Sequence, residues 1–450
     1  MSSKRKCPEC NQKYTNTMWN WCMPCNSKHF QNDFNNWTSG NDKIDKFIQD
    51  AQLNANSKWE VIEWIPYDRF KDVKQIGKGG FGTIHYARWI DAEIKEWDIE
   101  NQQWKRYWHS YEKDEVALKK FDNFVNFNDV LNEMEIHLKT YTGSNSVTSI
   151  RFYGIAQDPE THSYMMVLDY AKAGNLREYL KINFDNINWE QKLHNLYRLS
   201  LRLTKIHELD IVHQDFHPGN ILSSNFENSI LMVISDFGLS KLIGANPNNP
   251  EKKNIFGVLP YIAPEVLSGE EYTKAADVYS FGIIAYEMIT GFPPYPDIPH
   301  DKDLAMRICN GLRPKIPSYT PKLITRMIMR CWDARITYRP TFEELWNELD
   351  KYWKDYRDYL EGKNKDSEIV IQIKKAEEFS ANQESTNTTT TTTPTPLNYK
   401  THPQAIYTSR LLNFLNLPKP KNEENFEREL EELTKSIGDS GIIDLDMSNF

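Results

Sequence analysis

The segment HQDFHPGN, residues 213–220, places Asp215 five residues before Asn220. A histidine precedes the aspartate by two positions, and a glycine directly precedes the asparagine. Further along, the apolar run ILMVIS leads into DFG at residues 236–238. An apolar run that ends at a glycine-containing triplet predicts a strand followed by a turn. Taken alone, DFG needs no role beyond that turn, so its meaning depends on the segments around it.

A glycine cluster lies upstream, in IGKGGFGTI at residues 76–84. Gly77, Gly79 and Gly82 fit the pattern GxGxxG, for which a tight hairpin turn is the simplest interpretation. A dinucleotide-binding loop with this pattern requires a helix directly after the glycines, whereas the strand-like TIHYARW follows here. Glycines that join two strands can instead form a flexible lid whose backbone amides approach phosphates.

Two further segments complete a set of motifs. VALK places Lys119 at the end of a short apolar strand, where a lone lysine would be only an edge-strand charge. APE occupies residues 263–265. Together and in this order, GxGxxG, VALK, HxDxxxxN, DFG and APE are similar to the signature of protein kinases. The resemblance extends from near Tyr67 to near Leu360.

Strand-like runs dominate the first third of this region and helix-spaced apolar residues the remainder, which indicates an α+β fold. The kinase resemblance implies a bilobal fold with an antiparallel-sheet N-lobe and a helical C-lobe. Residues 277–299 and 331–345 resemble the tyrosine-kinase-like group, which includes many Ser/Thr enzymes. In the helical part we expect Gly291 to end one helix, and Thr341 with Glu344 to open another as a capping box.

The resemblance also implies catalytic roles. Lys119 is expected to hold the α- and β-phosphates of ATP and to pair with a helix carboxylate, for which Glu133 is the first candidate and Glu135 the second. Asp215 is expected to accept or orient the proton of the substrate hydroxyl. Asn220 and Asp236 are the expected Mg²⁺ ligands.

The nucleotide-binding set follows from the same resemblance. Leu168 is the expected gatekeeper behind the adenine, and Asp169 and Ala171 are expected to bond to it through their backbone. The full set is Ile76, Gly77, Lys78, Gly79, Gly80, Phe81, Gly82, Thr83, Ile84, Ala117, Lys119, Leu168, Asp169, Ala171 and Leu222. Three further residues have structural roles in the resemblance: Glu265 and Arg339 as a buried ion pair, and Asp277 as a brace for the catalytic loop.

Three residues depart from the family pattern. Gln214 replaces an arginine that commonly reads a phosphate on the activation loop, and residues 241–260 contain no Ser, Thr or Tyr. We therefore predict no phosphorylation switch inside 241–260, while Ser240 and Tyr261 at its borders stay open. His217 replaces a lysine of Ser/Thr kinases, although a neutral imidazole can still donate one hydrogen bond. Val258 replaces a threonine that often bonds the catalytic aspartate.

The N-terminal part contains two CxxC pairs separated by eleven residues, with Cys7, Cys10, Cys22 and Cys25 as the thiols. Each pair can present two thiolates to one tetrahedral Zn²⁺, which predicts a structural zinc module over residues 1–30. The alternative is four unrelated thiols. The spacing does not decide whether such a module binds nucleic acid or protein.

The rest of the chain divides by composition. Residues 31–63 are expected to form a linker with a short helix in DKIDKFIQDAQL, residues 64–360 the kinase domain, and residues 361–450 a mostly disordered acidic tail. In the tail, YTSRLLNFLNLP is a candidate docking motif and FERELEELTKSI a candidate helix, with disorder favoured for both. IKEW and WKRYW, within residues 90–114, are predicted strands. Their tryptophans, Trp97, Trp104 and Trp108, are expected to pack within the lobe rather than bind a partner.

Composition and net charge restrict the expected location and partners of the protein. The net charge is −9, most of it in the tail, so bulk charge indicates no nucleic-acid partner. No apolar run suits a membrane span, MSSKRKC does not read as a signal peptide, and six cysteines form no disulfide framework. We expect a cytoplasmic protein whose partner is a protein substrate; the sequence does not indicate an oligomeric state.

These observations predict an ATP-dependent protein kinase in intracellular signalling, with Ser/Thr favoured over Tyr and with ATP, Mg²⁺ and structural Zn²⁺ as cofactors. Two alternatives remain. One is a nucleotide-binding pseudokinase that acts as a scaffold. The other is a protein whose zinc module binds nucleic acid or protein as its main function.

Overall fold

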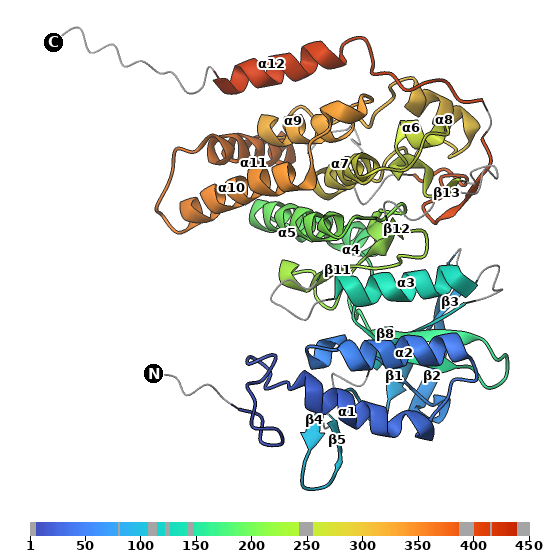
Figure 1. Ribbon diagram of the computed structural model, residues 1–450. Coiled ribbons are helices and arrows are strands. Elements are labelled where there is room, and N and C mark those ends of the chain that lie inside the picture. Colours follow the sequence, from blue (N-terminus) through green and yellow to red (C-terminus); the bar gives the residue numbers. More distant parts are fainter. Residues whose placement is uncertain are drawn as a thin grey trace. The chain divides into compact units, whose positions relative to one another are not determined.

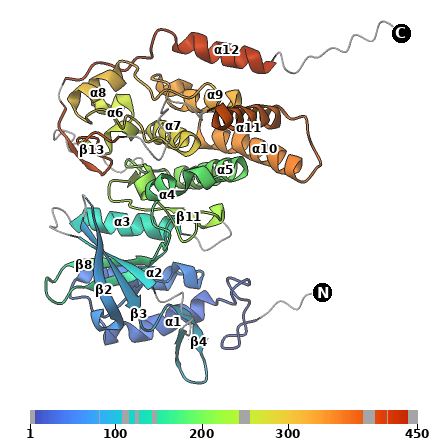
Figure 2. The ribbon, with the colours of Figure 1, turned by 180° about the vertical axis from the view of Figure 1, so that it is seen from behind.

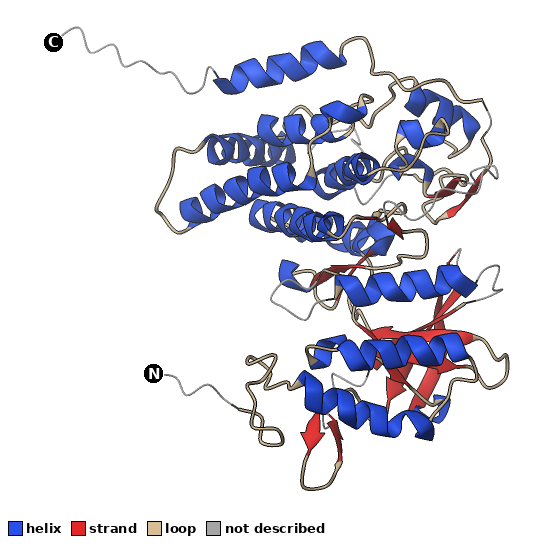
Figure 3. Cartoon of the chain, viewed as in Figure 1, coloured by secondary structure: helices blue, strands red, loops and turns tan. Residues whose placement is uncertain are grey.

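The computed structural model describes residues 6–79, 82–106, 115–121, 127–141, 148–242, 255–386, 400–414 and 416–438 (Figure 1). The chain forms two compact units, one of residues 1–172 with 233–238 and the other of residues 173–232 with 239–450. Strands predominate in the first unit and helices in the second (Figure 3). The predicted α+β organisation, with a sheet-rich and a helical part, is therefore confirmed.

The first unit contains a six-stranded sheet in the order β1-β7-β8-β6-β3-β2. Its strands are β1 (Glu63–Trp64), β2 (Phe70–Gly79), β3 (Gly82–Trp89), β6 (Glu115–Lys120), β7 (Phe152–Gln157) and β8 (Tyr164–Asp169). All neighbours are antiparallel except β1 and β7, which run parallel. Alternate apolar residues of these strands form a buried core that includes Val116, Leu118, Met165 and Val167.

Helices α1 (Met23–Asp33) and α2 (Asp42–Asn54) lie on one face of this sheet, as the opposite views of Figures 1 and 2 show. Helix α2 occupies the stretch in which the sequence predicts a short helix. Its apolar side follows from Ile44 and Ile48, four positions apart and both fully buried. The third helix of the unit is α3 (Phe127–Thr140).

The insert between the glycine loop and VALK forms a separate antiparallel hairpin of β4 (Ile94–Asp98) and β5 (Gln103–Arg106), as predicted. Trp97 stacks on His29 with ring centroids 3.9 Å apart, and Trp104 stacks on Phe30 at 4.3 Å. The hairpin thus packs on α1, and these two tryptophans are packing residues. Trp108 lies outside the described residues.

The second unit is built mainly from helices, with several short strands between them. The helices are α4 (Leu176–Asn183), α5 (Trp189–Glu208), α6 (Pro264–Leu267), α7 (Lys274–Thr290), α8 (Lys302–Cys309), α9 (Lys322–Cys331), α10 (Phe342–Leu360), α11 (Glu368–Thr386) and α12 (Phe426–Gly438). The short strands are β9 (Ile211–Val212), β10 (Ile221–Ser223), β12 (Lys241–Leu242), β13 (Ile255–Gly257) and β14 (Arg410–Leu412); β11 (Met232–Ile234) precedes DFG.

The predicted helix boundaries in this unit are confirmed. Gly291 ends α7 in the left-handed region at φ 74°, which suits a residue without a Cβ. Thr341 and Glu344 form both hydrogen bonds of a capping box at the start of α10.

The tail contains regular elements although its composition favours disorder: α12 coincides with the candidate helix FERELEELTKSI, and β14 lies in the candidate docking motif YTSRLLNFLNLP, whereas the sequence does not predict α11. Residues 387–399, with the threonine run, and residues 439–450 lie outside the described residues. Between them, α12 and β14 are present, and α11 precedes both. Ile369, Val370 and Ile373 of α11 are buried, so this helix has an apolar face with a partner surface. No helix within the described ranges has the length and apolarity to cross a bilayer.

Candidate active site

Lys119, a buried residue of β6, is held by two carboxylates. Its Nζ lies 2.5 Å from Oε1 of Glu133 on α3 and 2.7 Å from Oδ1 of Asp236. Burial alone would lower the pKa of Lys119, but the carboxylates of Asp236 and Glu133 outweigh this effect and raise it above its usual value. Lys119 is therefore a fixed, fully charged ammonium group.

Of the two candidate partners on α3, the structure joins Glu133 to Lys119. Glu133 is buried, whereas Glu135 is exposed and forms an ion pair with Lys139, one turn along the same helix, at 2.6 Å. Two positions along a helix correspond to a rotation of about 200°, so the two side chains face opposite directions.

Asp236 has an unusual backbone and a partly open carboxylate. Its φ of 61° is left-handed, a conformation that non-glycine residues rarely adopt and that often marks functional positions. The next residue, Phe237, is fully buried with its ring edge-on to His137 of α3 at 4.9 Å. Phe237 thereby anchors the triplet, while the Asp236 side chain stays 32% exposed. That carboxylate is placed to bind a cation from solvent.

The glycine loop is a hairpin end, as the strand-like residues after it predict. Gly77 pairs with Ile84, Lys78 with Thr83, and Gly79 with Gly82. A Cβ at Gly82 would lie 2.0 Å from the carbonyl oxygen of Lys120, so only glycine fits there. Gly80 and Phe81 lie outside the described residues.

The remaining nucleotide-set residues occupy strands and their ends. Ala117 pairs with Leu168 across β6 and β8, and the side chain of Leu168 is buried. Asp169 follows, and its N–H donates to the carbonyl of Arg151 at 3.0 Å. Ile76 is an exposed apolar residue of β2. Ala171 lies in the first unit, whereas Leu222 lies on β10 of the second.

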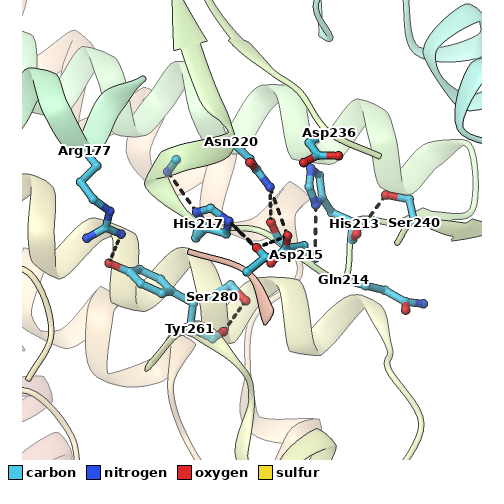
Figure 4. Close-up of polar contacts among 12 residues, drawn as sticks. Arg177, His213, Gln214, Asp215, His217, Asn220, Asp236, Ser240, Tyr261 and Ser280 are labelled. Atoms are coloured by element: carbon cyan, nitrogen blue, oxygen red, sulfur yellow. Dashed lines mark hydrogen bonds and ion pairs between the residues drawn. The ribbon is translucent and has the colours of Figure 1, made fainter. Parts of the chain in front are cut away.

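In the second unit, HQDFHPGN forms a tight loop between β9 and β10 (Figure 4). The fully buried carboxylate of Asp277 accepts hydrogen bonds from the backbone N–H groups of His213 at 2.9 Å and Gln214 at 3.2 Å. Gln214 has a left-handed φ of 66°. Asp277 thus stabilises a strained loop conformation, which is the bracing contact that the sequence resemblance implies.

Two side chains of this loop, those of Asn220 and His217, point toward Asp215 (Figure 4). The amide nitrogen Nδ2 of Asn220 donates to the backbone oxygen of Asp215 at 2.9 Å. The imidazole Nε2 of His217 lies 3.6 Å from Asp215 Oδ1. The backbone N–H of Gly219 donates to His217 Nδ1 at 3.0 Å, so in the neutral ring the proton resides on Nε2. His217 therefore donates from Nε2 toward the centre of the loop.

One further side chain reaches Asp215, and sequence reasoning missed it. The hydroxyl of Ser409, from the tail, donates to Asp215 Oδ2 at 2.5 Å, and its Oγ lies 3.1 Å from His217 Nε2. Ser409 lies in the candidate docking motif YTSRLLNFLNLP, but no local spacing points to this contact, because it joins residues 194 positions apart.

The hydroxyls at the borders of the activation loop have structural partners. Ser240 donates to the carbonyl of His213 at 2.9 Å and is buried. The phenol of Tyr261 lies 2.8 Å from Arg177 and also bonds to Glu287, and burial raises the pKa of Tyr261 well above its usual value. Residues 243–254 lie outside the described residues, so the prediction for 241–260 remains untested there.

The expected structural ion pair is present. Both oxygens of the Glu265 carboxylate accept from the guanidinium of Arg339, at 2.6 and 2.7 Å, and both side chains are buried. This bidentate pair fixes the end of the activation segment to the start of α10.

The four N-terminal cysteines gather at one point of the first unit, with their sulfur atoms within 4.8 Å of one another. Cys7 and Cys25 are 3.8 Å apart, and Cys10 and Cys22 are 3.6 Å apart. Four thiolates about 2.3 Å from one zinc ion would lie about 3.8 Å from each other at the corners of a tetrahedron. The cluster therefore has the donor atoms and the spacing of a Cys₄ zinc site.

Comparisons with known proteins agree with the kinase motifs of this site. The family described as protein tyrosine and serine/threonine kinase matches residues 70–349. Similar curated proteins include a serine/threonine-protein kinase/receptor named from Acanthamoeba polyphaga mimivirus, 30% identical over 68% of this chain and 17% of the relative. The serine/threonine-protein kinase VIK of Arabidopsis thaliana is 30% identical over 65% of this chain and 62% of the relative. The tyrosine-protein kinase SPK-1 of Girardia tigrina is 26% identical over 64% of this chain and 54% of the relative. The matched region thus spans less than two thirds of each relative.

Proposed function

The chain belongs to the protein tyrosine and serine/threonine kinase family, and we propose that it transfers the γ-phosphoryl group of ATP to hydroxyl groups of proteins, in the cytoplasm, as a signalling enzyme. The observation that carries this proposal is the buried Lys119 between Glu133 and Asp236. An ammonium group fixed in this way is ready to bind phosphate oxygens without reorganisation, which is the main contribution of a protein to phosphoryl transfer.

Each residue has a role in this proposal. Lys119 binds the α- and β-phosphates, and Glu133 keeps its ammonium group in place. Asp236 and Asn220 would each be a ligand of Mg²⁺, which would neutralise charge that develops on the phosphates. Asp215 orients the acceptor hydroxyl and takes its proton, and Asp277 holds the backbone that carries Asp215.

We propose Ser and Thr as the preferred acceptors, and the tyrosine-kinase-like group as the branch. The relatives named above as serine/threonine kinases support this preference, although one similar protein is named as a tyrosine kinase. The segments 277–299 and 331–345 support the branch.

Labelled ATP tests the proposal. The full chain, incubated with ATP, Mg²⁺ and casein as a general acceptor, should incorporate phosphate into serine and threonine, and Asp215→Ala should not. Equal incorporation by both proteins would contradict the assignment of Asp215. Nucleotide binding without any transfer would support the alternative function, a pseudokinase scaffold. The observation behind this alternative is that Gln214 and His217 depart from the family pattern.

We further propose that Cys7, Cys10, Cys22 and Cys25 bind one structural Zn²⁺. Burial raises the pKa of Cys22 to about 11, so zinc must displace a proton that this thiol otherwise retains at neutral pH. Elemental analysis of the purified chain should find about one zinc per molecule. Cys22→Ser should lose it, whereas Cys309→Ser, at a buried thiol outside the cluster, should keep it. A chain that neither contains zinc nor binds added Zn²⁺ would overturn this site.

A zinc module whose main function is to bind a protein or nucleic acid is the second candidate function. Loss of partner binding in Cys7→Ser with unchanged phosphoryl transfer would favour it.

A further inference from the structure

The tail returns to the catalytic loop within the second unit. Strand β14 pairs antiparallel with β13, with Ile255 opposite Leu412 and Gly257 opposite Arg410. Strand β13 belongs to the activation segment that starts at DFG and ends at APE. An extended peptide that adds a strand to such an edge gains affinity from its backbone and specificity from its side chains. The tail therefore binds in the manner of a peptide ligand.

Residues before the strand make specific contacts. The ring of Tyr407 lies under the guanidinium of Arg177, 4.5 Å from it, and its phenol donates to the carbonyl of Pro294 at 2.8 Å. The backbone N–H of His300 donates to the carbonyl of Gln404 at 2.9 Å. His300 Nδ1 also lies 2.9 Å from the carbonyl of Ile406.

Contacts after Ser409 continue the pattern. The guanidinium of Arg410 donates to the carbonyl of His300. Leu412 is only 4% exposed, whereas its neighbour Leu411 is 42% exposed. The segment is thus bound on both sides of Ser409, and alternate residues of β14 face the protein, as a strand requires.

Ser409 lies where an acceptor hydroxyl must be. Its proton points to Asp215 Oδ2 at 2.5 Å, and its oxygen accepts from His217 Nε2 at 3.1 Å. The hydroxyl is thereby oriented with its proton on the proposed base, and a second lone pair of the oxygen remains for bond formation. Thr408, the neighbouring hydroxyl residue, is exposed.

We propose that residues 402–412 are a tethered substrate of this kinase and that Ser409 is its site of autophosphorylation. The inference rests on the proposed phosphoryl transfer, whose acceptor class it specifies: a serine in an extended segment, with an aromatic residue two positions before it and a buried apolar residue three positions after it.

The step balances without a further reactant. The Ser409 oxygen forms a bond to the γ-phosphorus of ATP while the bond from that phosphorus to the bridging oxygen of the β-phosphate breaks, and ADP leaves. The hydroxyl proton passes to Asp215 Oδ2. His217 Nε2–H fixes the oxygen but transfers no proton.

The same contacts make the segment a regulator. Before modification, the Ser409 hydroxyl is hydrogen-bonded to the Asp215 carboxylate, and β14 pairs with the edge of β13. No other peptide can then bind to that carboxylate or to that strand edge. A phosphate on Ser409 adds a charge of about −1.5 to −2 beside the Asp215 carboxylate and removes the proton that joined them. Repulsion then releases the segment and opens the site to substrates in trans.

Mapping the phosphate tests the acceptor. Full-length protein, first treated with a broad-specificity phosphatase, is given ATP and Mg²⁺ at several protein concentrations, with casein as a parallel substrate. We expect phosphate on Ser409 by mass spectrometry, formed with a first-order rate constant that does not change with protein concentration. Thr408→Ala should keep this rate, and Ser409→Ala should lose that phosphate while retaining transfer to casein.

The outcomes separate the two claims. Transfer to casein without phosphate on Ser409 would overturn the tethered substrate and leave the kinase function intact. Phosphate on Ser409 at a rate proportional to protein concentration would overturn the intramolecular step. No transfer to casein or to the chain would overturn the kinase function itself.

A matched pair of variants tests whether the unphosphorylated segment blocks the binding of other peptides. Leu412→Asp should detach β14 and lower the apparent KM for a peptide of residues 402–414 by about tenfold or more, because a tethered competitor acts at millimolar effective concentration. Leu411→Asp, at the exposed neighbour, should leave that KM unchanged. Tyr407→Ala is a second release variant. Unchanged KM in both release variants, measured on unphosphorylated protein, would contradict the block.

Discussion

At the residue scale, the side chains of Glu133 and Glu135 leave the same helix in opposite directions, and this difference decides which of them can contact Lys119. Glu133 contacts Lys119 in the interior, while Glu135 contacts Lys139 in solvent. Exposed ion pairs of the second kind contribute little, because water and salt screen them. The buried ion pair of Glu133 and Lys119 has no such screening. Without the Glu133 carboxylate, the Lys119 ammonium group would be held by Asp236.

Glu133→Gln should therefore reduce phosphoryl transfer by about 100-fold, through misplacement of Lys119 rather than loss of folding. Glu135→Gln is the matched control and should stay close to wild type. Steady-state kinetics with casein measures both, and thermal unfolding verifies that the two proteins are folded. Similar rates for the two variants would show that Glu133 does not position Lys119.

The sequence predicts the residues of the site better than their surroundings. Lys119, Asp215, Asn220 and Asp236 stand in motifs whose spacing is local, so one chain suffices to find them. The contact of Ser409 with Asp215 depends on how a distant segment returns, which no local spacing encodes.

At the element scale, α5 and α10 pack through a stack of rings. His194 lies parallel to Trp353 with centroids 4.6 Å apart, and Tyr197 stacks on the same indole at 5.2 Å. Burial, followed by the nearby Arg198, Arg202 and Arg357, lowers the pKa of His194 to about 4 from a usual 6.5. The folded protein thus resists protonation of this imidazole.

This shift gives the unfolding free energy a defined pH dependence. Between pH 6.5 and 4 the unfolded chain binds the proton more readily, so stability is complete above pH 6.5 and falls as the pH drops toward 4. The loss should be on the order of 2 kcal/mol. His194→Phe keeps the ring but cannot titrate, and urea unfolding between pH 7 and 4.5 should show a smaller decrease for it. His162→Asn, at an exposed histidine, should follow wild type; identical curves for all three proteins would exclude His194 as the cause.

For the insert hairpin, the strands can be predicted from the sequence, but the surface on which they pack cannot. Its strands could be read from IKEW and WKRYW, because alternation is a local property. The surface that covers its tryptophans could not, since His29 and Phe30 lie more than sixty positions earlier and their helix gives no sign of this partner.

At the scale of the whole molecule, each unit is stabilised by contacts between distant segments. In the second unit, Arg339 binds Glu265 and also donates to the carbonyls of Asp333 and Ala275. One buried guanidinium therefore joins the activation segment, α7 and the start of α10. Removing the charge of the Glu265 carboxylate would leave the buried guanidinium of Arg339 without this counter-charge.

Glu265→Gln should lower the free energy of unfolding by about 3 to 5 kcal/mol, the usual result of breaking one side of a buried pair. Glu270→Gln, at an exposed carboxylate five positions later, should change it by less than about 0.5 kcal/mol. Urea unfolding monitored by tryptophan fluorescence measures both. A small loss for Glu265→Gln would show that the Arg339 charge finds compensation elsewhere.

Strand β1 has a practical consequence for recombinant fragments. The family match begins at residue 70, yet β1 supplies the outer strand beside β7, with Ile65 N–H donating to the carbonyl of Ile155 at 2.8 Å. A Cβ at Gly154 would lie 2.0 Å from the carbonyl oxygen of Glu63, so β7 is shaped around this strand. Expression from residue 70 would leave a bare sheet edge prone to aggregation. A catalytic fragment intended for crystallisation should therefore begin upstream of residue 63 and include α1 and α2.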